Sequence, residues 1–113
     1  MLPKQYRLAR SDFDLVFKKG RRIRGKTFSL VVLPSENKDE TSKIGIVITK
    51  KVHKKAVDRN KLKRQVSDIV YHYALGTLPK GLKAVIMAFP TQKSREYQET
   101  KEEIIDLFDK ATC

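Results

Sequence analysis

Strand-forming side chains are concentrated in three segments of the chain. Residues 28–33 and 44–49 are rich in branched apolar side chains, and 82–89 is a third such run that ends at Pro90. Runs of this kind predict buried strands, because β-branched side chains pack well on a pleated surface. We expect the first two strands to pair antiparallel. Gly45 should mark a bulge or a close backbone contact.

Three other segments carry apolar residues at helical spacing. The first begins with a capping box in which Ser11 is the N-cap, and it ends at Gly20. The second runs from its N-cap Asp58 to about residue 75, and the third covers 94–110. Helices mixed with strands in this order, too few for a doubly wound sheet, predict an α+β fold built as a two-layer α/β sandwich.

The second helix is predicted to have two distinct faces. At about 100° per residue its apolar face collects Leu62, Val66, Ile69, Val70 and Tyr73. The opposite face collects Asn60, Arg64, Ser67 and Tyr71, with Lys63 at its flank. One face should pack on the sheet, which leaves the other for a partner. In the last helix we expect Tyr97, Ile104, Ile105 and Phe108 to point inward.

Length and charge narrow the classes of function. The 113 residues, 40% of them hydrophobic, predict a single domain spanning 1–113 with one core. Lys and Arg number 25 against 13 Asp and Glu, a net charge of +12. Segment 50–64 has eight basic residues and one acidic residue, and segment 18–26 has six basic residues and no acidic residue. Acidic residues are concentrated after residue 95. A basic protein whose positive and negative charges are segregated in this way is suited to binding a polyanion.

Nucleic acid is the favoured polyanion. A membrane-surface protein would place its cations on a long amphipathic helix, whereas the basic clusters here lie largely in predicted strand-to-helix connections. The longest apolar run, 84–89, is far shorter than the roughly 20 residues of a membrane-spanning helix. The N-terminus lacks a signal-peptide core and the single cysteine is Cys113, so we expect a cytoplasmic protein without an intrachain disulfide.

Catalytic groups are scarce. His53 and His72 stand outside any metal-binding or nucleophile pattern, and we expect neither to be catalytic. The chain has no phosphate-binding glycine loop or dinucleotide fingerprint. Acids of the last segment could share a helix face and bind Mg²⁺, which leaves a metal-dependent nuclease as one hypothesis; these acids are Glu96, Glu99, Glu102, Glu103 and Asp106.

Binding groups are better represented. A basic cluster at the start of the second helix, 58–64, combines cations with free backbone N–H groups that favour phosphate oxygens. Single-stranded nucleic acid also stacks on aromatic rings. Phe13 and Phe17, four residues apart, are candidates for stacking or for core packing, whereas Phe28 and Phe89 are expected in the core.

At residues 59–64, Arg-Asn-Lys-Leu-Lys-Arg, the chain resembles the Arg-Asn-Arg-x-Lys-Arg signature of the bacterial ribonuclease P protein subunit. Residues 13–20 are similar to the first-helix motif of that family, and 44–51 to its central strand with paired lysines. Residues 99–108 fall where its last helix would lie. Together these pieces cover nearly the whole chain in the right order.

The resemblance implies a noncatalytic protein that joins a catalytic RNA, ribonuclease P RNA. That RNA removes the 5′ leader of precursor tRNA by Mg²⁺-dependent hydrolysis. The resemblance assigns RNA-subunit binding to Arg59, Asn60, Lys61, Lys63 and Arg64, and leader binding to Phe13, Phe17, Lys50 and Lys51. It implies no cofactor bound by the protein itself and no obligate protein partner. The holoenzyme would be the endoribonuclease.

The resemblance also implies a helix-strand-strand-strand-helix-strand-helix order like the second domain of ribosomal protein S5, with a left-handed crossover. Lys61 departs from the family signature, because lysine keeps the charge of arginine but not its planar bidentate geometry. A structural RNA-binding protein of the ribosomal type remains the alternative, since the same charge and fold would serve it.

Overall fold

The computed structural model describes residues 4–35, 39, 41–48, 55–74, 81–88 and 97–112. The helices are η1 (Lys4–Tyr6), α1 (Arg10–Lys19), α2 (Ala56–Ile69), its continuation η2 (Val70–Ala74) and α3 (Tyr97–Thr112). The strands are β1 (Arg21–Arg24), β2 (Phe28–Pro34), β3 (Lys43–Val47) and β4 (Leu82–Ala88). After η1 the order is therefore helix, three strands, helix, strand, helix, which confirms the mixed α and β class.

One sheet joins the four strands in the order β1-β2-β4-β3. Strand β2 is antiparallel to both β1 and β4, whereas β3 runs parallel to β4. The predicted antiparallel pair of 28–33 with 44–49 is therefore wrong, because β4 lies between these two strands. Strands β2 and β4 contain unbroken apolar runs and take the two central places, while β3, interrupted by Gly45, takes an edge.

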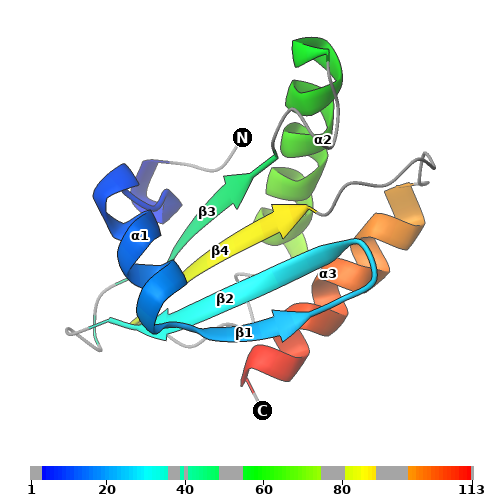
Figure 1. The fold of residues 1–113 in the computed structure, drawn as a ribbon. Coiled ribbons are helices and arrows are strands. Elements are labelled where there is room, and N and C mark those ends of the chain that lie inside the picture. Colours follow the sequence, from blue (N-terminus) through cyan, green and yellow to red (C-terminus); the bar gives the residue numbers. More distant parts are fainter. Residues whose placement is uncertain are drawn as a thin grey trace.

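Helices cover both faces of the sheet (Figure 1). Helices α2 and α3 contact each other on one face, over a core that includes Leu30, Ile69, Ile86 and Ile104. Helix α1 packs on the other face through a smaller cluster of Leu8, Val16, Val31 and Val85. The predicted two-layer sandwich thus gains a partial third layer, because the central strands are apolar on both sides and each side needs a cover.

The helix starts differ from the predicted caps. Ala9 rather than Ser11 is the N-cap of α1, and Lys55 rather than Asp58 is the N-cap of α2; neither makes a side-chain capping bond. The chain before α1 is already fixed on the edge of β3, where the Leu8 N–H donates to the Ile44 oxygen at 3.2 Å. This anchor lets the helix start earlier than its capping box predicts.

Gly20 ends α1 as predicted. Its N–H donates to the Val16 oxygen at 2.7 Å. A Cβ at Gly20 would lie 2.4 Å from that backbone oxygen and 2.6 Å from Val31 Cγ1. This position, where the chain leaves α1 and enters β1, therefore has no room for a side chain and requires glycine.

The faces of α2 are only partly as predicted. Val66, Ile69 and Val70 are buried, but Ser67, expected on the open face, is 3% exposed and donates to the Lys63 oxygen at 2.8 Å. Tyr73, expected in the core, is 44% exposed. It lies in η2, a π-helical turn. Such a turn rotates each residue through a smaller angle than an α-helix does, so Tyr73 moves off the buried face.

Helix α3 packs largely as expected. Ile104 and Phe108 are buried together with Leu107, whereas Tyr97 is 42% exposed. The first residues of the predicted helix, before Tyr97, lie outside the described residues. Within the part of the chain that the structure describes, no helix has the length and apolar content needed to cross a bilayer.

Candidate RNA interface

The five residues assigned to RNA-subunit binding all lie in the first half of α2. Asn60, Lys61 and Arg64 are exposed, while Arg59 and Lys63 are partly buried. The first half of α2 extends beyond the sheet (Figure 1), and Leu62 packs it against the larger core. The cations are thus held on a rigid helix, where they can contact a phosphate backbone without first being ordered.

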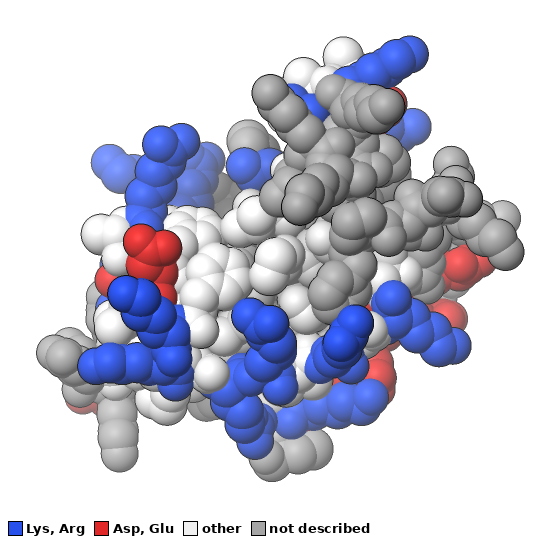
Figure 2. All heavy atoms as spheres, viewed as in Figure 1, with Lys and Arg blue, Asp and Glu red and all other residues white. Residues whose placement is uncertain are grey.

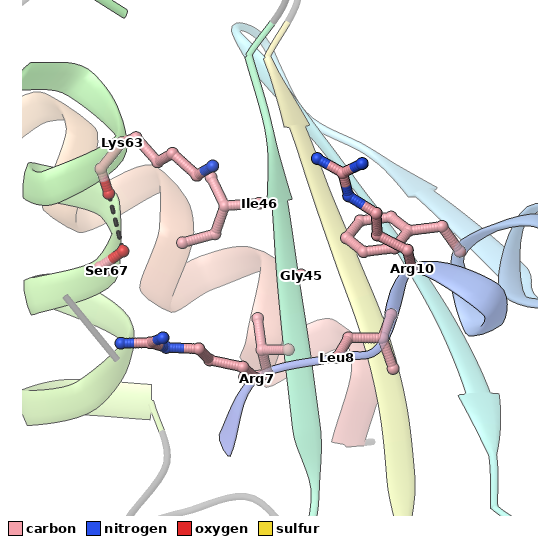
Figure 3. A pocket seen from close by; sticks show the side chains of 9 residues that line it. Arg7, Leu8, Arg10, Gly45, Ile46, Lys63 and Ser67 are labelled. Atoms are coloured by element: carbon pink, nitrogen blue, oxygen red, sulfur yellow. Dashed lines mark hydrogen bonds between the residues drawn. The ribbon is translucent and has the colours of Figure 1, made fainter. Parts of the chain in front are cut away.

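A groove of about 290 Å³ separates α2 from the N-terminal part of the chain (Figure 3). Lys63 and Ser67 line it from α2, and Arg7 and Arg10 line it from the N-terminal segment, with Arg7 extending toward α2 and Arg10 on the other side of β3 (Figure 3). The edge strand β3 runs along its floor, with Gly45 and Ile46 between the two walls (Figure 3). Three cations from two separate elements therefore surround one hollow, an arrangement suited to an anionic ligand.

Phe13 closes this groove on the side of α1. A Cβ placed on Gly45 would lie 2.4 Å from Phe13 Cζ, so the ring rests directly on the backbone of β3. The close backbone contact predicted at Gly45 is confirmed, and the atom that makes the contact is an aromatic ring. Phe13 and Lys63 line the same groove, so one leader-binding candidate and one RNA-subunit candidate share one surface.

Phe17 is partly buried and packs on the smaller cluster beneath α1. Helix α1 is tied to the sheet by an ion pair of 3.4 Å between Asp12 and Lys83. Figure 2 shows uncharged side chains in the middle of this face, with Lys and Arg gathered over α1 and along β1. Phe28, by contrast, is 1% exposed and belongs to the core, as expected.

Four further arginines lie on these surfaces and were not among the predicted site residues. Arg7 and Arg10 line the groove. In the β1-β2 pair, Arg22 lies opposite Val31 and Arg24 lies opposite Ser29. Cross-strand partners point to the same face of a sheet, and Val31 packs beneath α1, so both arginines lie on the face that α1 covers. The basic run 18–26 is visible in the sequence. Only the pairing register of β1 with β2 shows that Arg22 and Arg24 lie on one face of the sheet and Arg21 on the other.

Arg21 points to the opposite face, where its guanidinium donates to the Lys110 and Ala111 oxygens of α3 at 3.4 and 3.1 Å. This arginine therefore supports the fold by satisfying carbonyls at the end of a helix. The basic run thus divides between structure and surface.

Two acids of α3 make structural contacts. Glu103 Oε2 accepts the N–H groups of Thr27 and Phe28 at 2.9 and 2.6 Å, which holds the turn between β1 and β2. Asp106 pairs with Lys110 at 3.1 Å. Among the described residues, no three His, Cys, Asp or Glu side chains are grouped so as to hold a metal ion. Glu96 lies outside these residues.

Several predicted residues lie outside the described parts of the chain: Lys50, Lys51, His53 and Phe89. Their roles stay predictions. His72 is exposed on η2, as expected for a helix-surface histidine.

Known proteins resemble this chain along almost its full length. A family model described as Ribonuclease P matches residues 2–112. A protein of Pseudanabaena sp. named Ribonuclease P protein component is 41% identical, over 98% of this chain and 95% of its own. A protein of the same name from Synechocystis sp. is 35% identical, over 97% and 88%.

Solved structures share the fold. The RNase P protein from Thermotoga maritima superposes with a TM-score of 0.78 at 31% identity, covering 92% of this chain and 96% of its own. A Staphylococcus aureus RNase P protein gives a TM-score of 0.81 at 21% identity, over 94% of each chain. The second likeness concerns the fold alone.

Proposed function

The chain belongs to the ribonuclease P protein family, and we propose that it binds the RNA subunit with α2 and the 5′ leader of precursor tRNA with the face beside α1. As a ribonuclease P protein component, it works with ribonuclease P RNA in tRNA 5′ processing. The holoenzyme is an endoribonuclease whose catalysis is in the RNA. A structural ribosomal-type protein is not favoured by this membership.

The groove in Figure 3 carries the proposal. It joins Lys63 of α2 to Arg10 and Phe13 of the α1 segment across the edge of β3. One continuous surface can then contact catalytic RNA on one wall and substrate RNA on the other. Cations between two RNA strands offset their phosphate repulsion, which is the reason to expect that the protein lowers the Mg²⁺ requirement of the complex.

Leader binding rests on Phe13 and Phe17. Both rings are partly exposed on the α1 side and are held against the sheet. A partly exposed ring fixed on a rigid element is a platform on which an unpaired base can stack, and nearby cations hold the backbone. Lys50 and Lys51 are proposed as further leader contacts because the family resemblance assigns them this role and they come three and four residues after the end of β3.

The remaining family features are also proposals. They include a single RNA-binding domain over 1–113, a cytoplasmic location, no bound cofactor and a topology like the second domain of ribosomal protein S5. Support for the topology comes from the parallel neighbours β3 and β4, between which the chain passes through α2 on the face away from α1.

The test is cleavage of a 5′-extended precursor tRNA by a bacterial ribonuclease P RNA at low Mg²⁺, with and without this chain. Cleavage that requires both components is the expected result, and RNA alone should need more Mg²⁺. No gain over RNA alone would contradict the proposal, and cleavage by protein alone would contradict the assignment of catalysis to RNA.

Leader binding is tested in the assembled complex with Phe17→Ala. Loss of one stacked base should weaken affinity for precursor tRNA by about tenfold. Affinity for leaderless tRNA should stay as in the parent complex. Leu15→Ala, which removes a 38% exposed apolar side chain from the same helix, is the matched control. Equal losses for both tRNAs would refute a leader contact at Phe17.

A further inference from the structure

An aromatic surface lies at the C-terminal end of α2, on the side of the sheet away from α1. It consists of Tyr6, Tyr71, His72 and Tyr73. The ring centroids of Tyr6 and Tyr71 are 6.0 Å apart, those of Tyr71 and His72 are 5.2 Å apart, and those of His72 and Tyr73 are 6.4 Å apart. Each pair meets edge to face, at interplanar angles of 65°, 83° and 66°. The four rings therefore form one continuous chain.

Packing accounts for Tyr6, which lies against the larger core, but not for the other three rings. Tyr71 and Tyr73 are 45% and 44% exposed, and His72 between them is exposed as well. The π-helical turn of η2 adds Tyr73 to the exposed rings, because α-helical geometry would place Tyr73 with Ile69 and Val70 in the core. Large rings kept in water by a distorted helix turn indicate a binding surface.

Cations lie close to two of the rings, in space or in the sequence. Lys101 Nζ lies 4.0 Å from the centroid of the Tyr73 ring. Lys4 and Arg7, both exposed, flank Tyr6 in the chain. The acid nearest in sequence is Asp68, exposed one turn before Tyr71. Aromatic rings combined with cations are the composition that binds unpaired nucleotides, since every base has a face that can stack.

The position of the aromatic surface on α2 indicates which RNA it would bind. Arg7, which follows Tyr6 in the chain, lines the same groove as Lys63 of the RNA-subunit residues, so the rings adjoin the wall of that groove. Tyr71 lies seven residues after Arg64, or about 10 Å along the helix axis. An RNA bound to the first half of α2 needs only a short continuation to reach the rings.

We propose that this aromatic surface binds unpaired nucleotides of the RNA subunit, with bases stacked on Tyr71 and Tyr73 and with Lys101 and Arg7 near the phosphates. This inference rests on the proposed binding of the RNA subunit by α2. It adds a second contact whose chemistry is stacking rather than charge.

The experiment compares two double variants with the parent chain in binding to ribonuclease P RNA. Tyr71→Leu with Tyr73→Leu removes the rings but keeps apolar bulk, and should raise the Kd about tenfold or more, the usual consequence of losing stacked bases. Tyr71→Phe with Tyr73→Phe keeps the rings and should bind as the parent does. Thermal unfolding of each variant shows that the fold is retained.

Chemical modification of the tyrosines locates the proposed RNA contact directly. The chain has four tyrosines, and nitration by tetranitromethane followed by mass spectrometry reports the access to each. Tyr71 and Tyr73 should be nitrated in the free protein and protected when ribonuclease P RNA is bound. This footprint requires no substitution.

The outcomes separate this inference from the proposed function. If the parent chain fails to bind ribonuclease P RNA, the proposed function fails. If the parent binds but the leucine variant binds equally well and both tyrosines stay reactive, only the aromatic surface is refuted. Normal assembly combined with weaker precursor tRNA binding in the leucine variant would also refute it, because the rings would then contact substrate.

Discussion

At the scale of single residues, the contact between Phe13 and Gly45 links packing to the proposed leader surface. A Cβ at residue 45 would lie 2.4 and 2.6 Å from two atoms of the Phe13 ring, so Gly45→Ala must displace that ring. We expect the free energy of unfolding, measured by urea denaturation, to fall by about 1 kcal/mol. This is the lower end of the usual cost of overpacking, because the partly exposed ring can move.

The control for this prediction uses the same substitution at Gly20. Phe13→Ala should relieve the overlap at residue 45, so the double variant should lose less stability than the two single losses summed. At Gly20 the added Cβ meets the Val16 backbone oxygen at 2.4 Å, and Phe13→Ala should give no relief. Strict additivity at Gly45 would contradict the contact.

At the scale of elements, Glu103 attaches α3 to the hairpin of β1 and β2. Its carboxylate accepts two backbone N–H groups, at 2.9 and 2.6 Å. Glu103→Ala should lower the free energy of unfolding by about 2 kcal/mol, because hydrogen bonds to a charged group are lost. Glu102→Ala removes the same charge from an exposed side chain bonded to Gln98, and should change it by less than about 0.5 kcal/mol. Equal losses would show that the hairpin does not depend on Glu103.

At the scale of the whole molecule, the net charge of +12 makes RNA binding depend on salt. Arg64→Ala should weaken binding of ribonuclease P RNA and reduce the slope of log K against log salt by about 1, the share of one phosphate contact. Lys110→Ala removes an equal charge from α3, where the lysine pairs with Asp106, and should leave the slope unchanged. Filter binding across a salt series tests both, and equal slopes for the two variants would place the RNA elsewhere.

The residue pattern along the chain predicted the three α-helices, three of the four strands, the mixed fold class and the basic stretch of α2, whereas β1 followed only from the family resemblance. These properties depend on local chemistry. Branched runs favour strands, Gly20 ends a helix, and the signature at 59–64 concentrates cations on one helix. Phe28 was assigned to the core and Gly45 to a close contact for the same kind of reason, and both predictions are confirmed.

The way these elements meet depends on contacts between segments that are far apart in the sequence. Strand order depends on which strands need cover on both faces, so β4 lies between β2 and β3 although it comes last in the chain. The groove gathers Arg7, Arg10 and Lys63 from separate segments, and the π-helical turn exposes Tyr73 against its periodicity. Contacts between distant residues fix these features, and residue spacing along a chain carries no record of such contacts.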